Sequence, residues 1–258
     1  MRPIRVGIQI QQQHATYPQI RDAWQRVEAS GADSLWNWDH FFPLAGDPNG
    51  MHLDNFTALG AMAEVTERID IGCLVAANSY RNPNLLADMA RTLDHISNGR
   101  FILAVGSGWN HRDYTEYGYE LGTPASRLRD LDRDMPIIMQ RLQTLNPPPI
   151  RQPFPVMIGG GGEKVTLRIV AQHANIWNGQ GEPDELAHKG KVLDEWCARV
   201  GRNPDEIERS AQLFAPQLDK LDEYYAAGIT HFITESAGPD YDLSTLQHLL
   251  DWRDSKQG

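Results

Sequence analysis

The sequence predicts an α/β fold, most simply a (β/α)8 TIM barrel, on three observations. Short apolar segments alternate with amphipathic helical segments eight times, which favours parallel strands joined by right-handed crossovers. The 258 residues match the usual size of such a barrel, so we expect a single domain over residues 1–258. A glycine-rich strand–turn–helix lies at residues 156–170. A doubly wound open sheet is the alternative, but its dinucleotide-binding glycines would follow the first strand, where Gln11, Gln12, Gln13 and His14 stand.

The spacing of apolar residues places each element. In the first helix Ile20, Ala23, Trp24 and Val27 recur every three to four residues, and Gly31 ends the run. The predicted strands are 4–10, 34–37, 69–75, 101–105, 156–158, 175–178, 207–214 and 229–234. The predicted helices are 18–30, 56–66, 85–97, 127–142 (with a possible kink at Pro136), 163–170, 184–200, 218–227 and 243–252.

The composition of the chain limits the kinds of molecule that the protein is expected to bind. The formal net charge is −10, from 34 acidic and 24 basic residues, which disfavours nucleic acid or an anionic membrane as the main partner. No apolar run approaches the roughly 20 residues that cross a bilayer, and no signal peptide is recognised. Cys73 and Cys197 fall in apolar patterns and are expected to be buried, reduced thiols. We therefore expect a cytoplasmic protein.

Two kinds of chemistry lack a signature. His14, His40, His52 and His111 do not have the spacing of metal ligands, and neither His-Glu-x-x-His nor paired cysteines occur. Residues 106–108 are Gly-Ser-Gly rather than the Gly-x-Ser-x-Gly elbow of a serine hydrolase. The sequence therefore predicts no metal site and no nucleophilic serine.

The residues that follow the predicted strands are polar, aromatic or glycine. In a barrel these positions meet at the face where chemistry takes place. They are Gln11, His14, residues 36–40, Asn78, residues 106–110, residues 159–163, residues 177–179 and Glu235. This composition indicates a small-molecule site for a flat heteroaromatic ligand that carries a phosphate.

The glycine-rich turn is the candidate for the phosphate. Gly159, Gly160, Gly161 and Gly162 follow an apolar strand and precede a helix. Glycine allows close backbone approach, and a helix N-terminus offers free N–H groups to an anion. The alternative is a tight strand-to-helix turn without a ligand.

Asp39 and His40 are the sharpest local pair. A carboxylate beside an imidazole can hold a ring nitrogen or transfer protons near neutral pH, whereas the structural alternative is a turn cap beside a backbone-bonded histidine. Trp38, Trp109 and Trp177 likewise either line a pocket or pack in the core.

Several motifs together resemble the luciferase-like monooxygenase superfamily, and within it the oxidoreductases that use the deazaflavin coenzyme F420. The order and spacing agree over roughly residues 4–180. The matching segments are Gly-Ala-Asp-Ser-Leu-Trp at 31–36, Asp-His-Phe-Phe-Pro at 39–43, Asn-Ser-Tyr-Arg-Asn-Pro at 78–83, Leu-Asp-His-Ile-Ser-Asn-Gly-Arg at 93–100, Ala-Val-Gly-Ser-Gly-Trp at 104–109, Tyr-Gly at 117–118 and Ile-Gly-Gly-Gly-Gly-Glu at 158–163.

The resemblance implies a flavin-like cofactor at the C-terminal face of the barrel. It implies Asp39 and His40 beside the cofactor ring, and a bulge with a non-prolyl cis peptide near Leu74–Val75 or Val75–Ala76 behind it. It assigns the phosphate to the backbone N–H groups of Gly160, Gly161 and Gly162. The full expected cofactor set is Asp39, Leu74, Val75, Ala76, Gly106, Ser107, Gly108, Gly159, Gly160, Gly161, Gly162, Trp177 and Asn178, and the expected substrate-side set is His14, Trp38 and Trp109.

The implied function is hydride transfer between F420 and an unidentified small organic substrate, with His40 as proton carrier and Asp39 orienting the ring. Trp109 stands where the sugar-phosphate dehydrogenase branch has a glutamate, and residues 145–155 form only a short connection where many relatives carry an insertion between strands 4 and 5. An FMN-dependent monooxygenase and a non-catalytic flavin-binding protein remain alternatives. A homodimer is expected from the family, and Lys164, Arg168 and Arg112 are candidates for a basic groove toward the F420 tail.

Overall fold

The computed structural model describes residues 2–257 and places their strands in a closed barrel. Strand β1 pairs in parallel with both β2 and β9, and β3 pairs with β5, so the sheet closes on itself. The strands within the described residues are β1 Arg5–Ile10, β2 Ser34–Asn37, β3 Asp70–Cys73, β4 Ala76–Ala77, β5 Phe101–Gly106, β6 Val156–Gly159, β7 Ile176–Gly179, β8 Glu208–Gln212 and β9 His231–Ser236. With eight strands in the closed ring and β4 as a short addition, the predicted (β/α)8 fold is confirmed.

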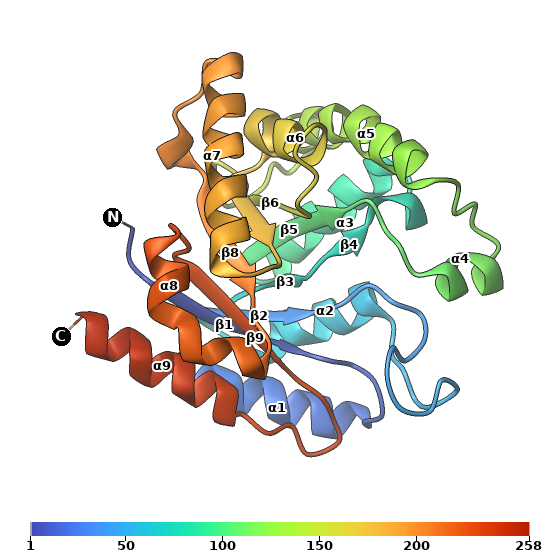
Figure 1. The fold of residues 1–258 in the computed structure, drawn as a ribbon. Coiled ribbons are helices and arrows are strands. Elements are labelled where there is room, and N and C mark those ends of the chain that lie inside the picture. Colours follow the sequence, from blue (N-terminus) through green and yellow to red (C-terminus); the bar gives the residue numbers. More distant parts are fainter. Residues whose placement is uncertain (1, 258) are drawn as a thin grey trace.

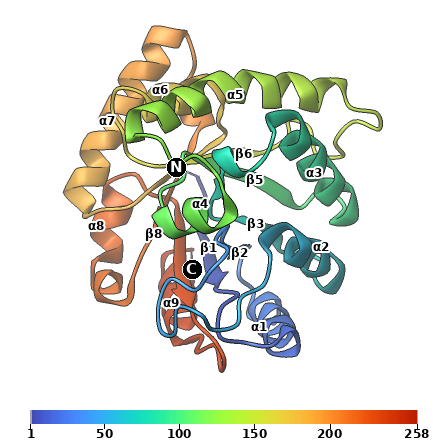
Figure 2. The ribbon, with the colours of Figure 1, turned by 90° about the vertical axis from the view of Figure 1, so that its right-hand side faces the viewer.

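Helices surround the barrel (Figures 1 and 2). Their bounds are α1 Tyr17–Ala29, α2 Asn55–Val65, α3 Pro83–Ile96, α4 His111–Tyr117, α5 Pro124–Thr144, α6 Thr166–His173, α7 Pro183–Val200, α8 Leu221–Ala226 and α9 Ser244–Gln257. Short 3-10 turns occur at η1 Asn78–Tyr80, η2 Pro204–Glu206 and η3 Ala215–Lys220. In Figure 2 the helices α1 to α3 and α5 to α9 form an outer ring, and α4 lies over the middle of it.

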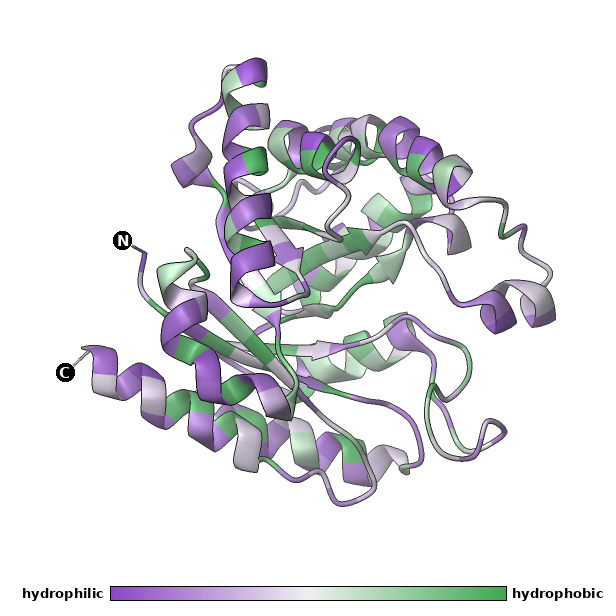
Figure 3. Ribbon diagram, in the orientation of Figure 1, coloured by the Kyte–Doolittle hydropathy of each residue, from purple (hydrophilic) through white to green (hydrophobic). Residues whose placement is uncertain are grey.

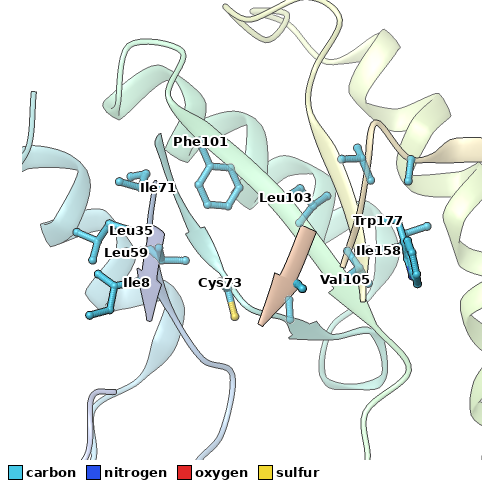
Figure 4. Close-up of a cluster of buried hydrophobic side chains, with 14 of the residues drawn as sticks. Ile8, Leu35, Leu59, Ile71, Cys73, Phe101, Leu103, Val105, Ile158 and Trp177 are labelled. Carbon is cyan, nitrogen blue, oxygen red and sulfur yellow. The ribbon is translucent and has the colours of Figure 1, made fainter. Parts of the chain in front are cut away.

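Alternation along the strands divides the core into two layers. Leu35, Leu103 and Val105 point outward to the helices, whereas Trp36 and Ile102 point into the barrel. This is the period of two that a strand imposes on its side chains. Figure 4 shows part of the outer layer, with Cys73 in it. In Figure 3 the strands of the barrel are largely hydrophobic. The helices that surround them are largely hydrophilic on their outer faces.

The third strand is shorter than the sequence predicts. The run expected over 69–75 ends at Cys73, and β4 resumes the pairing with β5 at Ala76. Between them the Leu74–Val75 peptide bond is cis, at the first of the two positions that the family resemblance implies. The chain bulges here because the two residues between β3 and β4 leave the ladder.

Three of the helices that differ from expectation lie near the pocket side or the glycine-rich turn: α4, α5 and α6. Helix α4 was missed because it is short and lacks an apolar stripe; the Asn110 side chain accepts a hydrogen bond from the Arg112 N–H at its start, and Tyr114 anchors it in the core. Helix α5 begins earlier because Thr123 caps it, and it continues through Pro136 as one element. Helix α6 begins only at Thr166, three residues later than predicted.

Two further predictions concern the cysteines and membrane-spanning helices. Cys73 and Cys197 are buried and free, as predicted. No helix within residues 2–257 has the length and apolar content needed to cross a bilayer.

Candidate active site

A pocket of about 690 Å³ opens at the C-terminal ends of the barrel strands. Its lining residues come from β1 and from segments at the C-terminal ends of most of the remaining strands. They are Gln9, Gln11, Gln13, Trp38, Asp39, His40, Leu44, Ala45, residues 74–77, Tyr80, residues 106–109, residues 159–161, Asn178, Gln180, Gln212, Phe214 and Glu235. Its volume is that of a small-molecule site.

A second cavity of about 660 Å³ lies at the opposite end of the barrel. Its charged groups satisfy one another, since Arg5 is 2.7 Å from Asp70 and 3.0 Å from Glu208. Paired charges at the N-terminal face of a barrel serve stability. We therefore assign the candidate active site to the C-terminal pocket.

His40 lines this pocket and is bound to a carboxylate that the sequence did not reveal. Its Nδ1 lies 2.6 Å from Asp113 Oδ2, and Asp113 is completely buried at the start of α4. The Phe41 N–H and the Tyr80 hydroxyl also donate to Asp113, at 3.1 and 3.3 Å. Because a carboxylate only accepts, Nδ1 carries the proton, which leaves Nε2 for the pocket.

Asp39 does not pair with its neighbour His40. Its two oxygens accept from the Arg81 guanidinium at 2.6 and 2.8 Å, from Asn55 Nδ2 at 3.0 Å and from the Ala77 N–H at 2.9 Å. These four bonds occupy the carboxylate, and Asp39 is only 3% exposed. The bond to Ala77 ties the end of β2 to the bulge, so Asp39 shapes the pocket wall beside the expected ring position.

The bulge packs against one glycine in β5 and one in β6. A Cβ on Gly106 would lie 2.7 Å from Val75 Cγ2, and a Cβ on Gly159 would lie 3.0 Å from Val75 Cγ1. The Leu74 carbonyl accepts a hydrogen bond of 2.8 Å from Gln9 Nε2. Leu74, Val75 and Ala76 line the pocket as expected, held in place by packing from β5 and β6.

The glycines after β5 have two roles. Ser107 and Gly108 line the pocket together with Gly106. A Cβ on Gly108 would lie 2.1 Å from the Tyr114 hydroxyl oxygen, and its φ is +76°. Gly108 therefore allows α4 to pack close to the pocket, which places Asp113 against His40.

Of the three N–H groups that were expected to bind a phosphate, the one of Gly160 has a protein acceptor. The Gly160 N–H donates to the Asn178 carbonyl at 3.0 Å, so it is not available to a phosphate as the sequence had suggested. For the N–H groups of Gly161 and Gly162, the described residues record no protein acceptor. The Lys189 ammonium of α7 lies beside Gly161, where a Cβ would come within 2.9 Å of it. Two free N–H groups and one ammonium fit a phosphate.

Two tryptophans have different positions. Trp177 is wrong as a cofactor contact: its side chain is fully buried in the outer core layer, and its Nε1 donates to the Gly160 carbonyl at 2.8 Å (Figure 4). It faces outward because its neighbours Ile176 and Asn178 face inward along β7. Trp109 lines the pocket edge-on to His40 and is 64% exposed, as a substrate-side wall would be.

Trp38 lines the pocket and His14 does not. Trp38 Nε1 donates to His52 Nε2 at 2.9 Å, and the two rings stack. Burial, with a smaller contribution from nearby His40, lowers the pKa of His52 to about 4, so its ring accepts this bond at neutral pH. His14 instead bonds the Ala45 carbonyl at 2.7 Å and packs on Gly50, so it supports a loop whose residues Leu44 and Ala45 line the pocket.

The expected basic groove is only partly present. Arg168 pairs with Asp132 at 2.8 Å, and Arg112 pairs with Glu116 at 2.6 Å and stacks on Phe42. Lys164 is exposed and has no recorded ion pair among residues 2–257. Within the same residues no group of three or more His, Cys, Asp or Glu side chains is arranged to hold a metal ion.

The family description of the luciferase-like monooxygenases matches residues 1–249. The chain belongs to this family.

Three relatives show which kinds of protein this luciferase-like chain is similar to. An uncharacterized protein of Mycobacterium tuberculosis is 28% identical over 199 residues, 70% of this chain and 68% of its own. A pyrimidine monooxygenase RutA of Stutzerimonas stutzeri is 29% identical over 73% of this chain and 56% of its own. An F420-dependent glucose-6-phosphate dehydrogenase of Amycolatopsis mediterranei is 42% identical over 85 residues, 32% of this chain and 25% of its own.

Solved structures support the luciferase-like fold over the whole chain. An F420-dependent secondary alcohol dehydrogenase in complex with an F420–acetone adduct superposes with a TM-score of 0.83 at 16% identity, covering 98% of both chains. A coenzyme F420-dependent tetrahydromethanopterin reductase from Methanopyrus kandleri gives 0.72 at 16% identity, covering 96% of both.

The luciferase-like site contains residues that sequence reasoning missed. Asp113, Arg81 and Lys189 are each more than 25 residues from the group they contact. Arg81 stood within a matched motif, which was a usable signal. Asp113 and Lys189 lie on helices with several charged neighbours, and the sequence alone does not distinguish them.

Proposed function

We propose that this luciferase-like protein is an F420-dependent oxidoreductase that acts on a small organic substrate. The observation that carries the proposal is the pocket itself. Free N–H groups and Lys189 lie at one edge, and the Leu74–Ala77 bulge forms a wall. This arrangement fits a flat cofactor with a phosphate, and the two F420-dependent enzymes that share this fold support the choice of cofactor. F420, when bound, supplies hydride transfer.

The phosphate is assigned to Gly161, Gly162 and Lys189. The two N–H groups donate along the backbone, and the ammonium adds a charge-assisted bond at the same point. Gly160 contributes through its carbonyl and N–H, which Trp177 and Asn178 hold in place. The turn is therefore fixed before the phosphate arrives, which reduces the entropy lost on binding.

His40 is assigned the proton. Asp113 holds its Nδ1–H, so the ring is oriented and Nε2 can accept a proton from, or return one to, a substrate oxygen or nitrogen. Trp38 and Trp109 enclose the imidazole edge-on at ring-centroid distances of 5.6 and 5.4 Å. Their rings limit the access of water on two sides of His40.

An FMN-dependent monooxygenase is the second candidate. The observation that favours it is the RutA relative, which aligns with 73% of this chain, a larger share than the F420-dependent dehydrogenase does. The N–H groups of Gly161 and Gly162 and the Lys189 ammonium, which we call the phosphate cradle, would hold the FMN phosphate in the same way. The two candidates differ in whether the protein binds a deazaflavin or a flavin.

We also propose that the protein is a cytoplasmic homodimer. Two large apolar side chains on α3 are exposed, Leu85 at 53% and Ile96 at 41%. They flank a groove of about 600 Å³ between α2 and α3 that also contains Phe56 and Met89. The same groove also contains the charged side chains of Asp88 and Arg91, and a surface with both apolar and charged groups suits contact with the same face of a second copy. The two buried free thiols fit a reducing compartment.

Titration of the purified protein with F420, and separately with FMN, tests the function. Gly161→Val and Lys189→Met are compared with Lys191→Met, a neighbouring exposed lysine of α7. Loss of one charge-assisted phosphate bond predicts about tenfold weaker F420 binding for Lys189→Met, and Lys191→Met should bind like the wild type. Preference for FMN would favour the monooxygenase, and binding of neither cofactor would refute both functions.

A further inference from the structure

The side of the pocket formed by β8, β9 and β1 carries a cluster of side-chain amides around one carboxyl group. Gln9 and Glu235 are register partners in adjacent strands, so their side chains emerge on the same face. Gln212 Nε2 lies 3.4 Å from Gln9 Oε1 and 3.4 Å from Glu235 Oε2. Gln11 also donates to Glu235. We call these four residues the Glu235 cluster.

Glu235 differs from the other carboxylates near this pocket in having no cationic partner. Asp39 is neutralised by Arg81, and Asp113 is bound by His40. Among the described residues that line the pocket, none is Lys or Arg. Burial raises the pKa of Glu235, and the amide hydrogen bonds offset this only in part. A partly buried carboxyl group served only by amides gains most from a ligand that brings positive charge.

Aromatic faces line the same pocket. Trp38, Trp109 and Phe214 contribute to its wall, and Trp109 and Phe214 are 64% and 39% exposed. Exposed aromatic rings in a pocket that also holds an acidic group favour an ammonium ion, because the ring faces carry negative electrostatic potential. The phosphate cradle at Gly161 is a separate region, on the loop after β6.

We propose that the Glu235 cluster binds a protonated amine of the substrate. This assignment deepens the proposed function, since it rests on the pocket being the substrate site of an oxidoreductase. Glu235 accepts the ammonium hydrogens, Gln11 and Gln212 hold the carboxylate in position, Gln9 orients Gln212, and the aromatic rings contact the adjoining carbon chain. The same acidic pocket disfavours carboxylate and phosphate substrates.

Calorimetric titration with three benzyl compounds tests the proposal. Benzylamine, benzyl alcohol and benzoate share a ring and differ in their polar group. Each is titrated into the wild type, Glu235→Gln and Glu223→Gln, an exposed control on α8, with and without saturating F420. We expect benzylamine to bind at least tenfold more tightly than benzyl alcohol to the wild type and Glu223→Gln. In Glu235→Gln the preference should disappear, while the affinity for benzyl alcohol stays within about twofold.

Equal binding of benzylamine and benzyl alcohol to the wild type would overturn the proposal without reference to any variant. Retained amine preference in a folded Glu235→Gln protein would overturn it as well. Loss of F420 binding in that variant, with the amine preference intact, would assign Glu235 to the cofactor instead. Amine preference in a protein that binds no F420 would support the cluster and refute only the F420-dependent function.

Discussion

At the scale of single residues, the histidine beside the pocket depends on a carboxylate that lies 73 positions away. Asp113 is completely buried and receives bonds from His40, the Phe41 N–H and the Tyr80 hydroxyl. A buried carboxylate with several donors is rigid, so it fixes both the tautomer and the orientation of the imidazole. We therefore propose Asp113 as a positioning residue and His40 as the group that meets the substrate.

We predict that Asp113→Asn alters the tautomer of His40. An asparagine oxygen holds the Nδ1–H less strongly than a carboxylate, so nitrogen NMR of the ring should show a larger share of Nε2–H than in the wild type. When Asp113→Asn is assayed with a substrate that the wild type converts, its kcat should be about 10- to 100-fold lower. Its affinity for the cofactor should be unchanged. Glu116→Gln, an exposed change on the same helix, serves as control. An unchanged tautomer would contradict the positioning role.

A second residue-scale prediction concerns acid stability. The pKa of His52 is about 4 in the folded protein and near 6.5 when unfolded, so the unfolded state binds more protons between these values. Stability from this group is therefore complete above about pH 6.5 and is lost as pH falls toward 4. Because His52 is partly exposed, solvent reduces the effect to about 1 kcal/mol.

Thermal melts at pH 7 and pH 5 check this expectation. His52→Gln keeps an acceptor for the Trp38 N–H and removes the titration. The variant should therefore lose about 1 kcal/mol less stability than the wild type over this interval. The exposed His248→Gln should behave like the wild type. An identical pH response of the wild type and His52→Gln would show that protonation of His52 does not limit stability.

At the scale of elements, the bulge between β3 and β4 depends on glycines in the strands beside it. Val75 occupies the space that a side chain on Gly106 or Gly159 would need. Asp39 at the end of β2 and Gln9 in β1 bind the backbone of the same segment through the Ala77 N–H and the Leu74 carbonyl. The bulge is thus held from both sides, which suits a rigid wall behind a planar ligand.

We predict that Gly106→Ala destabilises the protein and that Val75→Ala restores most of the loss. The new methyl group would meet Val75 Cγ2 at 2.7 Å, so one of them must move. Overpacking of this kind costs typically 1–3 kcal/mol, and removing the valine methyls relieves it. Urea denaturation of both single variants and the double variant measures the coupling. Additive effects of the two substitutions would contradict the direct contact.

At the scale of the whole molecule, the two ends of the barrel carry different sets of side chains. The C-terminal end carries the pocket, α4 and the glycine-rich turn, whereas the N-terminal end is closed by the ion pairs of Arg5. Figures 1 and 2 show α4 set apart from the outer ring of helices on the pocket side. The outer face of α2 and α3 remains available to a second copy.

We predict that the wild type is a dimer and that Leu85→Glu with Ile96→Glu makes it a monomer. Two added carboxylates in the α2–α3 groove would have to lose their hydration at the interface, which is unfavourable. Light scattering after size-exclusion chromatography measures the mass. Ile150→Glu, an exposed apolar position elsewhere, should remain a dimer. A monomeric wild type would exclude the homodimer.

The sequence by itself determined the barrel, the order of its strands and most of the residues around the pocket. These follow from local patterns: a period of two or 3.6, a glycine run, and motifs within a few residues of one another. Trp38, His40 and the turn after β6 were found this way, whereas the bulge was expected only from the family resemblance. Trp177 was misplaced because the face to which a strand residue points depends on the register of the whole barrel.

Only the tertiary structure decided which groups are partners. It paired His40 with Asp113 and Asp39 with Arg81, directed the Gly160 N–H to Asn178 and placed Lys189 beside Gly161. It also left Glu235 with amides alone for partners in the pocket. These contacts join residues far apart in the chain, and many charged side chains in the sequence are equally plausible candidates. The choice among them depends on how helices and loops pack around the closed barrel, which no local pattern encodes.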